Sequence, residues 1–253
     1  MPRCARRVSE SGYYHVMLRG NGRQVIFEDD ADRRAFLEAL GEVMSSRGIE
    51  IVAWCLMSNH VHLLLTDVSA QLSDAIHALT TSYAGHFNRR FDHVGSVFAG
   101  RFRSVPVEDD AQLLAAVRYI HDNPVKAGVC ATPDEYPWSS YHEYVGEPWI
   151  SSVETVLDLL SGVDQFERFS LAPRPTGYCF MPGARVPEED AGDVARAAIY
   201  PLTLADVKTV DGSERVRALS LMRDAGLSVR QIERLTGIGR YAIEKGLLLA
   251  RNG

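Results

Sequence analysis

The sequence predicts an α+β protein: a ferredoxin-like split βαβ sheet with helices on one face, followed by a C-terminal helical extension. Over residues 1–145, apolar residues recur with strand and helix periods in the order β-α-β-β-α-β-α. Residues 171–192 concentrate proline, glycine and charge, which is typical of a linker. We therefore predict a first domain over 1–148, a connecting segment and linker over 149–190, and a helical domain over 191–253.

The first elements follow from local patterns. Residues 13–20 have the aromatic and β-branched content of a strand, and residues 30–48 have an acidic first turn, helical apolar spacing and a terminal glycine. Residues 49–57 and 60–67 are apolar runs separated by a short polar break, which predicts an antiparallel hairpin.

The later elements are predicted in the same way. Residues 71–91 have a helical apolar period, residues 96–107 alternate like a strand, and residues 109–124 form a helix that ends at proline. The aromatic-rich residues 136–149 are predicted to form a strap packed on the domain, and a helix is expected over 152–162.

Composition excludes several classes of protein. The net charge of −6 argues against a protein that coats duplex DNA by bulk electrostatics, although it allows a local basic groove. No apolar stretch approaches the roughly 20 residues that cross a bilayer, and no apolar signal core follows the basic N-terminus. The four cysteines are widely separated, so free thiols are expected. We expect a cytoplasmic protein without a membrane partner.

Two pairs of polar side chains stand out because of their spacing. His60 and His62 share one face of their predicted strand and could hold one metal ion, although an isolated pair of this kind is more often structural. Tyr119 and Asn123 lie four residues apart on one side of the predicted helix. A tyrosine at the core edge and a polar helix end are the plainer interpretations of that second pair.

Five ordered motifs connect these residues to a known family. They are RGNGRQ (19–24), MSNHVHLLL (57–65), FNRRF with GSVFAGRFRS (87–104), AVRYIHDNPVKAGV (116–129) and YPWSSY (136–141). With them, nearly all of residues 1–145 resembles the REP-associated tyrosine transposases, members of the HUH group of single-strand nucleases and transposases. The resemblance implies that His60 and His62 bind a divalent metal, Mg or Mn, that Tyr119 is the nucleophile, and that Asn123 is a third ligand.

The same resemblance implies the reaction. The enzyme would cleave and rejoin single-stranded DNA next to REP-like hairpins through a 5'-phosphotyrosine intermediate. Two neutral imidazoles and an amide oxygen leave coordination positions for phosphate oxygens, and a phenol needs such charge neutralisation to attack a phosphodiester. His121 falls about 200° around the helix from Tyr119 at the helical period, so it is predicted to lie on the surface rather than act as a base.

Arginines interleaved with polar and aromatic residues form the predicted DNA contacts. Basic groups on phosphates and rings under bases are the usual means of holding single strands, and a solvated charged surface is the alternative. The predicted set is Arg19, Asn88, Arg89, Arg90, Arg101, Phe102 and Arg103, with an N-terminal arm of Arg3, Arg6 and Arg7. Terminal disorder is the competing interpretation of that arm.

Residues 227–250 have the pattern of a helix-turn-helix centred on Gly237, with an ordinary helical bundle as the alternative. Glu233 and Gly246 depart from the usual helix-turn-helix pattern. If the motif binds duplex DNA, Arg240, Tyr241 and Lys245 would contact it and tether the enzyme near its target.

Two rival functions are retained: a host-adapted DNA-binding regulator of the same fold that does not cleave, and a hydrolytic metalloenzyme that uses water as nucleophile. We expect a nucleoid-associated location. The sequence leaves open a monomer or a homodimer, with the tyrosine acting on its own chain's histidines or on a partner's.

Overall fold

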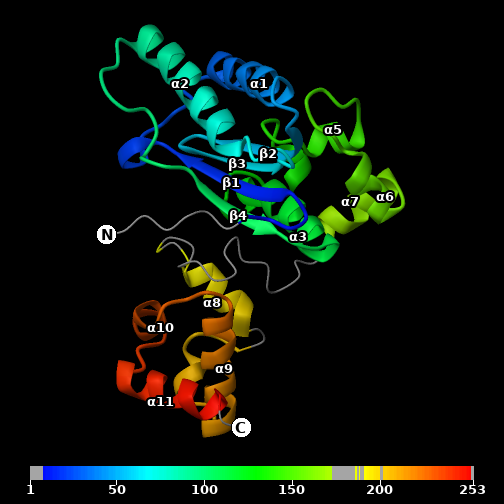
Figure 1. Cartoon of the computed structure of the whole chain (residues 1–253). Helices are drawn as coiled ribbons and strands as arrows, with labels where there is room; N and C mark the ends of the chain where they lie inside the picture. The colour runs from blue at the N-terminus through cyan, green and yellow to red at the C-terminus, as the bar shows by residue number, and fades with distance from the viewer. Residues whose placement is uncertain (1–7, 173–185, 187, 189–190, 200–201, 252–253) are drawn as a thin grey trace. The chain divides into compact units, whose positions relative to one another are not determined.

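The computed structural model describes residues 8–172, 186, 188, 191–199 and 202–251. The chain forms two compact units, Met1–Ala172 and Pro173–Gly253 (Figure 1). The first unit extends past residue 148 because two further helices pack on it. The predicted division at 148 and 190 stays a prediction.

The first unit is built on an antiparallel sheet in the order β2-β3-β1-β4. Its strands are β1 (Tyr13–Arg19), β2 (Glu50–Met57), β3 (His60–Thr66) and β4 (Arg103–Val107). Helix α1 (Asp30–Ser45) connects β1 to β2, and α2 (Leu72–Phe91) connects β3 to β4. The predicted ferredoxin-like topology is confirmed, and a short 3-10 turn, η1 (Asn21–Arg23), follows β1.

Different helices cover the two faces of the sheet (Figure 1). Tyr14, Val16 and Leu18 of β1 belong to one core cluster with the apolar side chains of α1 and α2. His15 points to the opposite face, where it meets Tyr119 of α3 (Asp110–His121). The predicted placement of helices on one face holds for α1 and α2 and is corrected for α3. The reason is that β1 and β3 are buried along both faces, so each face needs a covering layer.

The fourth strand is shorter than the alternation over residues 96–107 predicted. Phe98 makes a single bridge to Gly20, and the regular strand begins only at Arg103. Gly100 lies between them with a φ of +52°, a left-handed conformation that breaks an extended strand. The intervening segment forms a loop between the bridge and the strand.

A group of short helices covers the outer side of α3. These elements are α4 (Asn123–Lys126), η2 (Pro133–Glu135), α5 (Tyr141–Val145), α6 (Glu154–Leu160) and α7 (Val163–Leu171). Phe166 of α7 is fully buried and stacks on Tyr144 of α5, with ring centroids 4.5 Å apart. Arg118 of α3 lies over the Phe169 ring and donates to the carbonyl of Ala172. The last residues of this unit are therefore attached to α3.

His121 lies inside this covering layer, and its predicted surface position was wrong. Its ring is 1% exposed, contacts the Phe166 ring edge-on, and lies 2.8 Å from the Ser140 hydroxyl through Nε2. Burial lowers the pKa of His121 to about 3. The helical wheel assumed a single buried face, whereas α3 is packed between the sheet on one side and α5 and α7 on the other.

The second unit is helical over its described residues. Its elements are α8 (Ala191–Ile199), η3 (Asp206–Lys208), α9 (Gly212–Asp224), α10 (Val229–Thr236) and α11 (Arg240–Arg251). Apolar residues of these helices form a core that includes Leu219, Ile232 and Ile243. Gly237 ends α10 with a φ of +64°, so a turn separates α10 from α11.

The two departures from the usual helix-turn-helix pattern have structural explanations. The Glu233 carboxylate accepts a hydrogen bond from the backbone N–H of Arg240, so it caps the start of α11. A Cβ atom at Gly246 would lie 3.2 Å from Leu219 Cδ1, so the glycine lets α11 approach α9 closely. Among the described residues of both units, no helix is long and apolar enough to span a membrane.

Candidate active site

The histidine pair lies at the start of β3, directly after the hairpin turn. The strand period of two puts His60 and His62 on the face covered by α3, with ring centroids 5.2 Å apart. His62 is 3% exposed, whereas His60 is half-buried at the strand end. The pair therefore runs from the interior of the unit to its surface.

Tyr119 is brought to this pair by α3. Asp109 caps the N-terminus of the helix, accepting from the backbone N–H of Gln112, and the apolar face of α3 packs on the sheet. This packing places the half-buried Tyr119 ring with its centroid 5.7 Å from that of His62. The structure thus brings together the predicted nucleophile and the predicted metal-binding histidines.

The residues after α3 complete the surroundings of Tyr119. Asn123 donates from Nδ2 to the backbone carbonyl of Tyr119 at 2.9 Å, which fixes the orientation of its amide. Lys126, at the end of α4, places its exposed ammonium 3.6 Å from the centroid of the Tyr119 ring. Sequence reasoning did not assign Lys126, although it is the only lysine in residues 1–172.

His15 is a second residue that sequence reasoning missed. It is fully buried on β1, its Nε2 lies 3.0 Å from Nδ1 of His62, and its ring centroid lies 5.6 Å from that of Tyr119. The alternation of β1 could have indicated it, since Tyr14, Val16 and Leu18 account for the apolar face and leave His15 on the face of the histidine pair.

Burial sets the protonation of the inner histidines. It holds the pKa values of His15 and His62 well below the usual histidine value, with the Lys126 ammonium acting in the same direction. Both rings are therefore neutral near pH 7, which is the form that binds metals.

The donor atoms fit a sparse metal site rather than a closed one. His62 Nδ1 faces His15, and His60 Nδ1 lies 2.7 Å from the Asn59 side-chain oxygen, so each ring would offer Nε2 to a cation. In the described part of the chain, no group of three or more His, Cys, Asp or Glu side chains is placed to hold a metal ion. A cation here would take the Asn123 amide oxygen and complete its coordination with oxygen ligands from water or from a substrate.

The predicted DNA contacts around α2 differ in their surroundings. Arg90 forms ion pairs with both Asp29 and Asp32, at 2.5 Å in each case. Its charge is therefore balanced by carboxylates of the same unit. Asn88 contacts His93 and Gly95 in the turn after α2. Arg89 is exposed on the same helix end and keeps its side chain at the surface.

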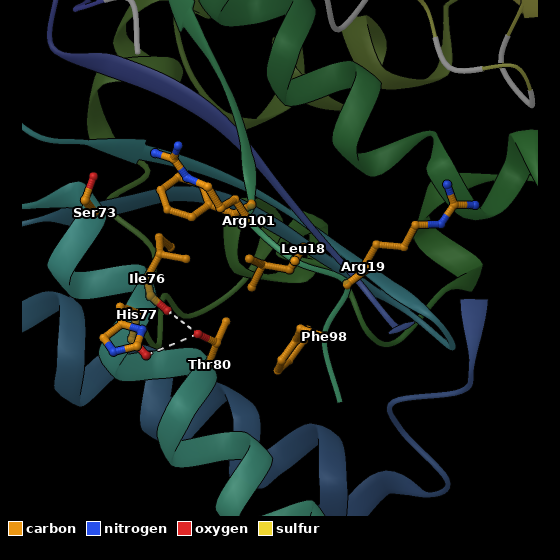
Figure 2. Close-up of a pocket in the computed structure, with 11 residues that line it drawn as sticks. Leu18, Arg19, Ser73, Ile76, His77, Thr80, Phe98 and Arg101 are labelled. Atoms are coloured by element: carbon orange, nitrogen blue, oxygen red, sulfur yellow. Dashed lines mark hydrogen bonds between the residues drawn. The ribbon is translucent and has the colours of Figure 1, made fainter. Parts of the chain in front are cut away.

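A pocket of about 240 Å³ lies between α2 and the loop before β4. Figure 2 shows Ile76, His77 and Thr80 of α2 along one side and Phe98 nearby. The remaining lining includes Leu18, Arg19, Ser73, Ala99, Gly100, Arg101 and Phe102. Arg19 is the β1 residue that pairs with His60 across the β1–β3 ladder, so the pocket lies near the end of the sheet that carries His60.

The remaining predicted DNA contacts lie on β4, on the second unit, or outside the described residues. Arg103 is exposed at the start of β4. Arg240, Tyr241 and Lys245 are exposed on α11 of the second unit. The N-terminal arm, Arg3, Arg6 and Arg7, lies outside the described residues.

The chain thus combines a split βαβ sheet, a histidine pair on the third strand and a tyrosine on the helix after the fourth strand. Residues 8–123 match the family model described as IS200-like transposase. This part of the chain, a little under half of it, is similar to that family of transposases, which are enzymes.

Two individual proteins show the same relationship. A Haemophilus influenzae protein named as a REP-associated tyrosine transposase is 27% identical over 121 residues, which cover 44% of this chain and 69% of that protein. A solved REP-associated tyrosine transposase bound to a REP hairpin shares the fold, with a TM-score of 0.50, 20% identity, and coverage of 60% of this chain and 93% of the other. The resemblance to REP-associated tyrosine transposases predicted from the sequence is confirmed.

Proposed function

We propose that this protein cleaves and rejoins single-stranded DNA beside a REP-like hairpin, with Tyr119 as the nucleophile. The observation that carries the proposal is the position of the Tyr119 ring, 5.7 Å from the His62 ring and on the same sheet face as the histidine pair. A tyrosine that only packed at the edge of the core would not need histidine rings beside it.

In the proposed reaction, Tyr119 Oη attacks the phosphorus of the scissile phosphodiester. A bond forms between the phenolic oxygen and phosphorus, the bond to the 3'-oxygen breaks, and that oxygen takes up a proton. The product is a 5'-phosphotyrosine with a free 3'-hydroxyl on the departing strand. Attack by a 3'-hydroxyl on the same phosphorus reverses the step and rejoins DNA, because the ester retains the bond energy.

This chain's own residues prepare the nucleophile. The Lys126 ammonium over the Tyr119 ring favours the negative charge that develops on the phenolic oxygen as its proton leaves. The sheet and the α5–α7 layer hold α3 from both sides, which keeps Tyr119 in place for an in-line attack.

We propose that His60 and His62, with the amide oxygen of Asn123, hold a divalent cation, Mg or Mn. When bound, such a cation supplies Lewis-acid stabilisation of charge on the phosphate oxygens. The buried neutral imidazole of His62, the His60 imidazole beside it and the oriented amide of Asn123 are suitable donors for it.

DNA binding is proposed for two separate surfaces. In the first unit, Arg101 and Phe102 line the pocket near His60, where a phosphate and a base could be held together. In the second unit, α10 and α11 would place Arg240, Tyr241 and Lys245 against duplex DNA beside the hairpin. A protein with these contacts would act at the nucleoid.

A covalent-adduct assay tests the proposal. The full chain is incubated with labelled single-stranded hairpins from repeats flanking its gene, with Mg²⁺, Mn²⁺ or chelator, and denatured adducts are separated by gel. Tyr119→Phe and His60→Ala should form no adduct. Tyr13→Phe is the matched control, because Tyr13 is a half-buried tyrosine at the opposite end of β1 from His60.

Other outcomes select the rival functions. Hairpin binding without adduct under any metal condition would identify a DNA-binding regulator that does not cleave. Turnover by Tyr119→Phe at the wild-type rate would identify a hydrolase that uses water. An adduct that requires metal, His60 and Tyr119 establishes the proposed chemistry.

A further inference from the structure

His15 occupies a position that the proposed reaction does not explain. It is completely buried in the middle of β1, where it is the cross-strand partner of Leu64 and its side chain faces α3. Its Nε2 lies 3.0 Å from Nδ1 of His62, and its ring meets Tyr119 at 68° with centroids 5.6 Å apart. Burying a polar ring is costly unless it is hydrogen-bonded, and the contact with His62 Nδ1 supplies such a bond.

A third metal ligand is the first explanation to consider, and the geometry argues against it. His15, His60 and His62 do not form a group that could hold a metal ion, within the residues that the structure describes. His15 Nε2 faces Nδ1 of His62, whereas the cation would bind the other ring nitrogen of His62, Nε2. His15 therefore acts on His62 rather than on the ion.

We propose that His15 is a positioning residue that fixes the tautomer and the rotation of the His62 ring, so that His62 Nε2 points into the metal site. This inference rests on the proposed function. His62 donates its Nδ1 proton to His15 Nε2, which requires the proton of His15 to be on Nδ1. Metal-binding histidines commonly use a carboxylate or carbonyl for this purpose, and here an imidazole takes that place.

The hydrogen bond has a second consequence, because the same two rings also border Tyr119. The Tyr119 ring centroid lies 5.7 Å from that of His62 and 5.6 Å from that of His15. The phenol therefore lies against two rings that are hydrogen-bonded to each other. Loss of the His15 nitrogen would leave the His62 ring free to rotate, so Tyr119 would no longer pack against a ring of fixed orientation.

The test is Mn²⁺ affinity of the full chain without DNA, measured by electron paramagnetic resonance of free Mn²⁺. His15→Leu removes the acceptor while keeping a buried apolar side chain of similar size. His15→Gln keeps an acceptor, since its Oε1 reaches about as far as the imidazole Nε2. Val16→Ala is the matched control, because Val16 is the fully buried neighbour that faces α1 and α2 instead of His62.

His15→Leu should lower Mn²⁺ affinity by about 10-fold to 100-fold, the range seen when an orienting partner is lost. His15→Gln should restore most of that affinity. Val16→Ala should lower the urea midpoint and leave Mn²⁺ affinity at the wild-type value, which separates positioning from general stability.

Unchanged Mn²⁺ affinity in His15→Leu, with His60→Ala abolishing binding, would overturn the role of His15 and leave the proposed function intact. Equal losses in His15→Leu, His15→Gln and Val16→Ala would reduce His15 to a structural role and also overturn the inference. Absence of Mn²⁺ binding by the wild-type chain would refute the proposed metal site and the inference with it.

Discussion

Replacing Glu143 with alanine should destabilise the first unit strongly, because its carboxylate joins β2 to the segment after α5. Glu143 is 6% exposed and accepts from Trp54 Nε1 at 2.7 Å. Its other oxygen accepts from the backbone N–H groups of Trp149, Ile150 and Ser151, at 2.7, 2.8 and 2.8 Å. Hydrogen bonds to a charged acceptor are the strong ones, so this single side chain carries much of the contact.

The expected loss of unfolding free energy depends on which of the N–H groups that bind Glu143 can be reached by water. The N–H groups of Trp54 and Ser151 are buried, and each would cost about 1–3 kcal/mol when left without an acceptor, whereas the other two are partly solvated. We therefore expect Glu143→Ala to lower the free energy of unfolding by about 4 kcal/mol, and Glu143→Gln by about half as much because it keeps one acceptor oxygen.

Tryptophan fluorescence during urea unfolding provides the assay. Trp54, Trp138 and Trp149 all belong to the first unit, so the signal reports that unit within the full chain. With a urea dependence of about 2 kcal/mol per molar, the midpoint should fall by roughly 2 M. The exposed neighbour Glu147→Ala is the control and should change little. A loss below about 1 kcal/mol in Glu143→Ala would refute the reasoning, since it would mean that water replaces the carboxylate at the buried donors.

Other contacts lead to four further predictions. Lys126→Met should slow adduct formation about tenfold without changing stability, because the exposed ammonium is lost from the tyrosine ring; an unchanged rate in a quenched-flow assay would contradict this. Arg90→Ala should lower the stability of the first unit, because the buried carboxylate of Asp32 loses its ion-pair partner, whereas Arg89→Ala should weaken only hairpin binding. Since Arg90 holds the pKa of Asp29 below 3.8, that pairing stabilises the fold above about pH 4 and is lost as pH falls further, so urea midpoints of wild type and Arg90→Ala should converge there. Gly246→Leu should cost about 1–3 kcal/mol, measured by far-ultraviolet circular dichroism, because its side chain would collide with α9; an unchanged melt would show that α11 can shift.

The strand and helix patterns predicted the sheet well because its strands are apolar runs bounded by turn residues and its helices carry apolar residues at helical spacing. The same patterns failed where a second layer covers an element. The helical wheel placed His121 on the surface, yet α5 and α7 bury it, since packing on both sides of α3 depends on contacts with residues more than twenty positions later. The break in the strand at Gly100 is local, but only its observed left-handed φ reveals it.

The candidate site shows a similar division. The spacing of His60 and His62 and the family resemblance led to Tyr119, and the structure brings these three side chains together. His15 lies 47 residues before its partner His62 in the chain, and only the pairing of β1 with β3 brings the two rings into contact. Lys126 reaches Tyr119 across the junction of α3 and α4, a turn geometry that spacing alone does not give.

The scarcity of lysine in the first unit allows a chemical label to be attached beside Tyr119. Because Lys126 supplies the only ε-amine among residues 1–172, an amine-reactive fluorophore would label one side chain of that unit, next to the phenol ring, once the α-amine is blocked. Replacing Lys208 and Lys245 with arginine would remove the remaining lysines without changing formal charge. A dye placed in this way would report the arrival of DNA at the site in real time, without a cysteine being introduced.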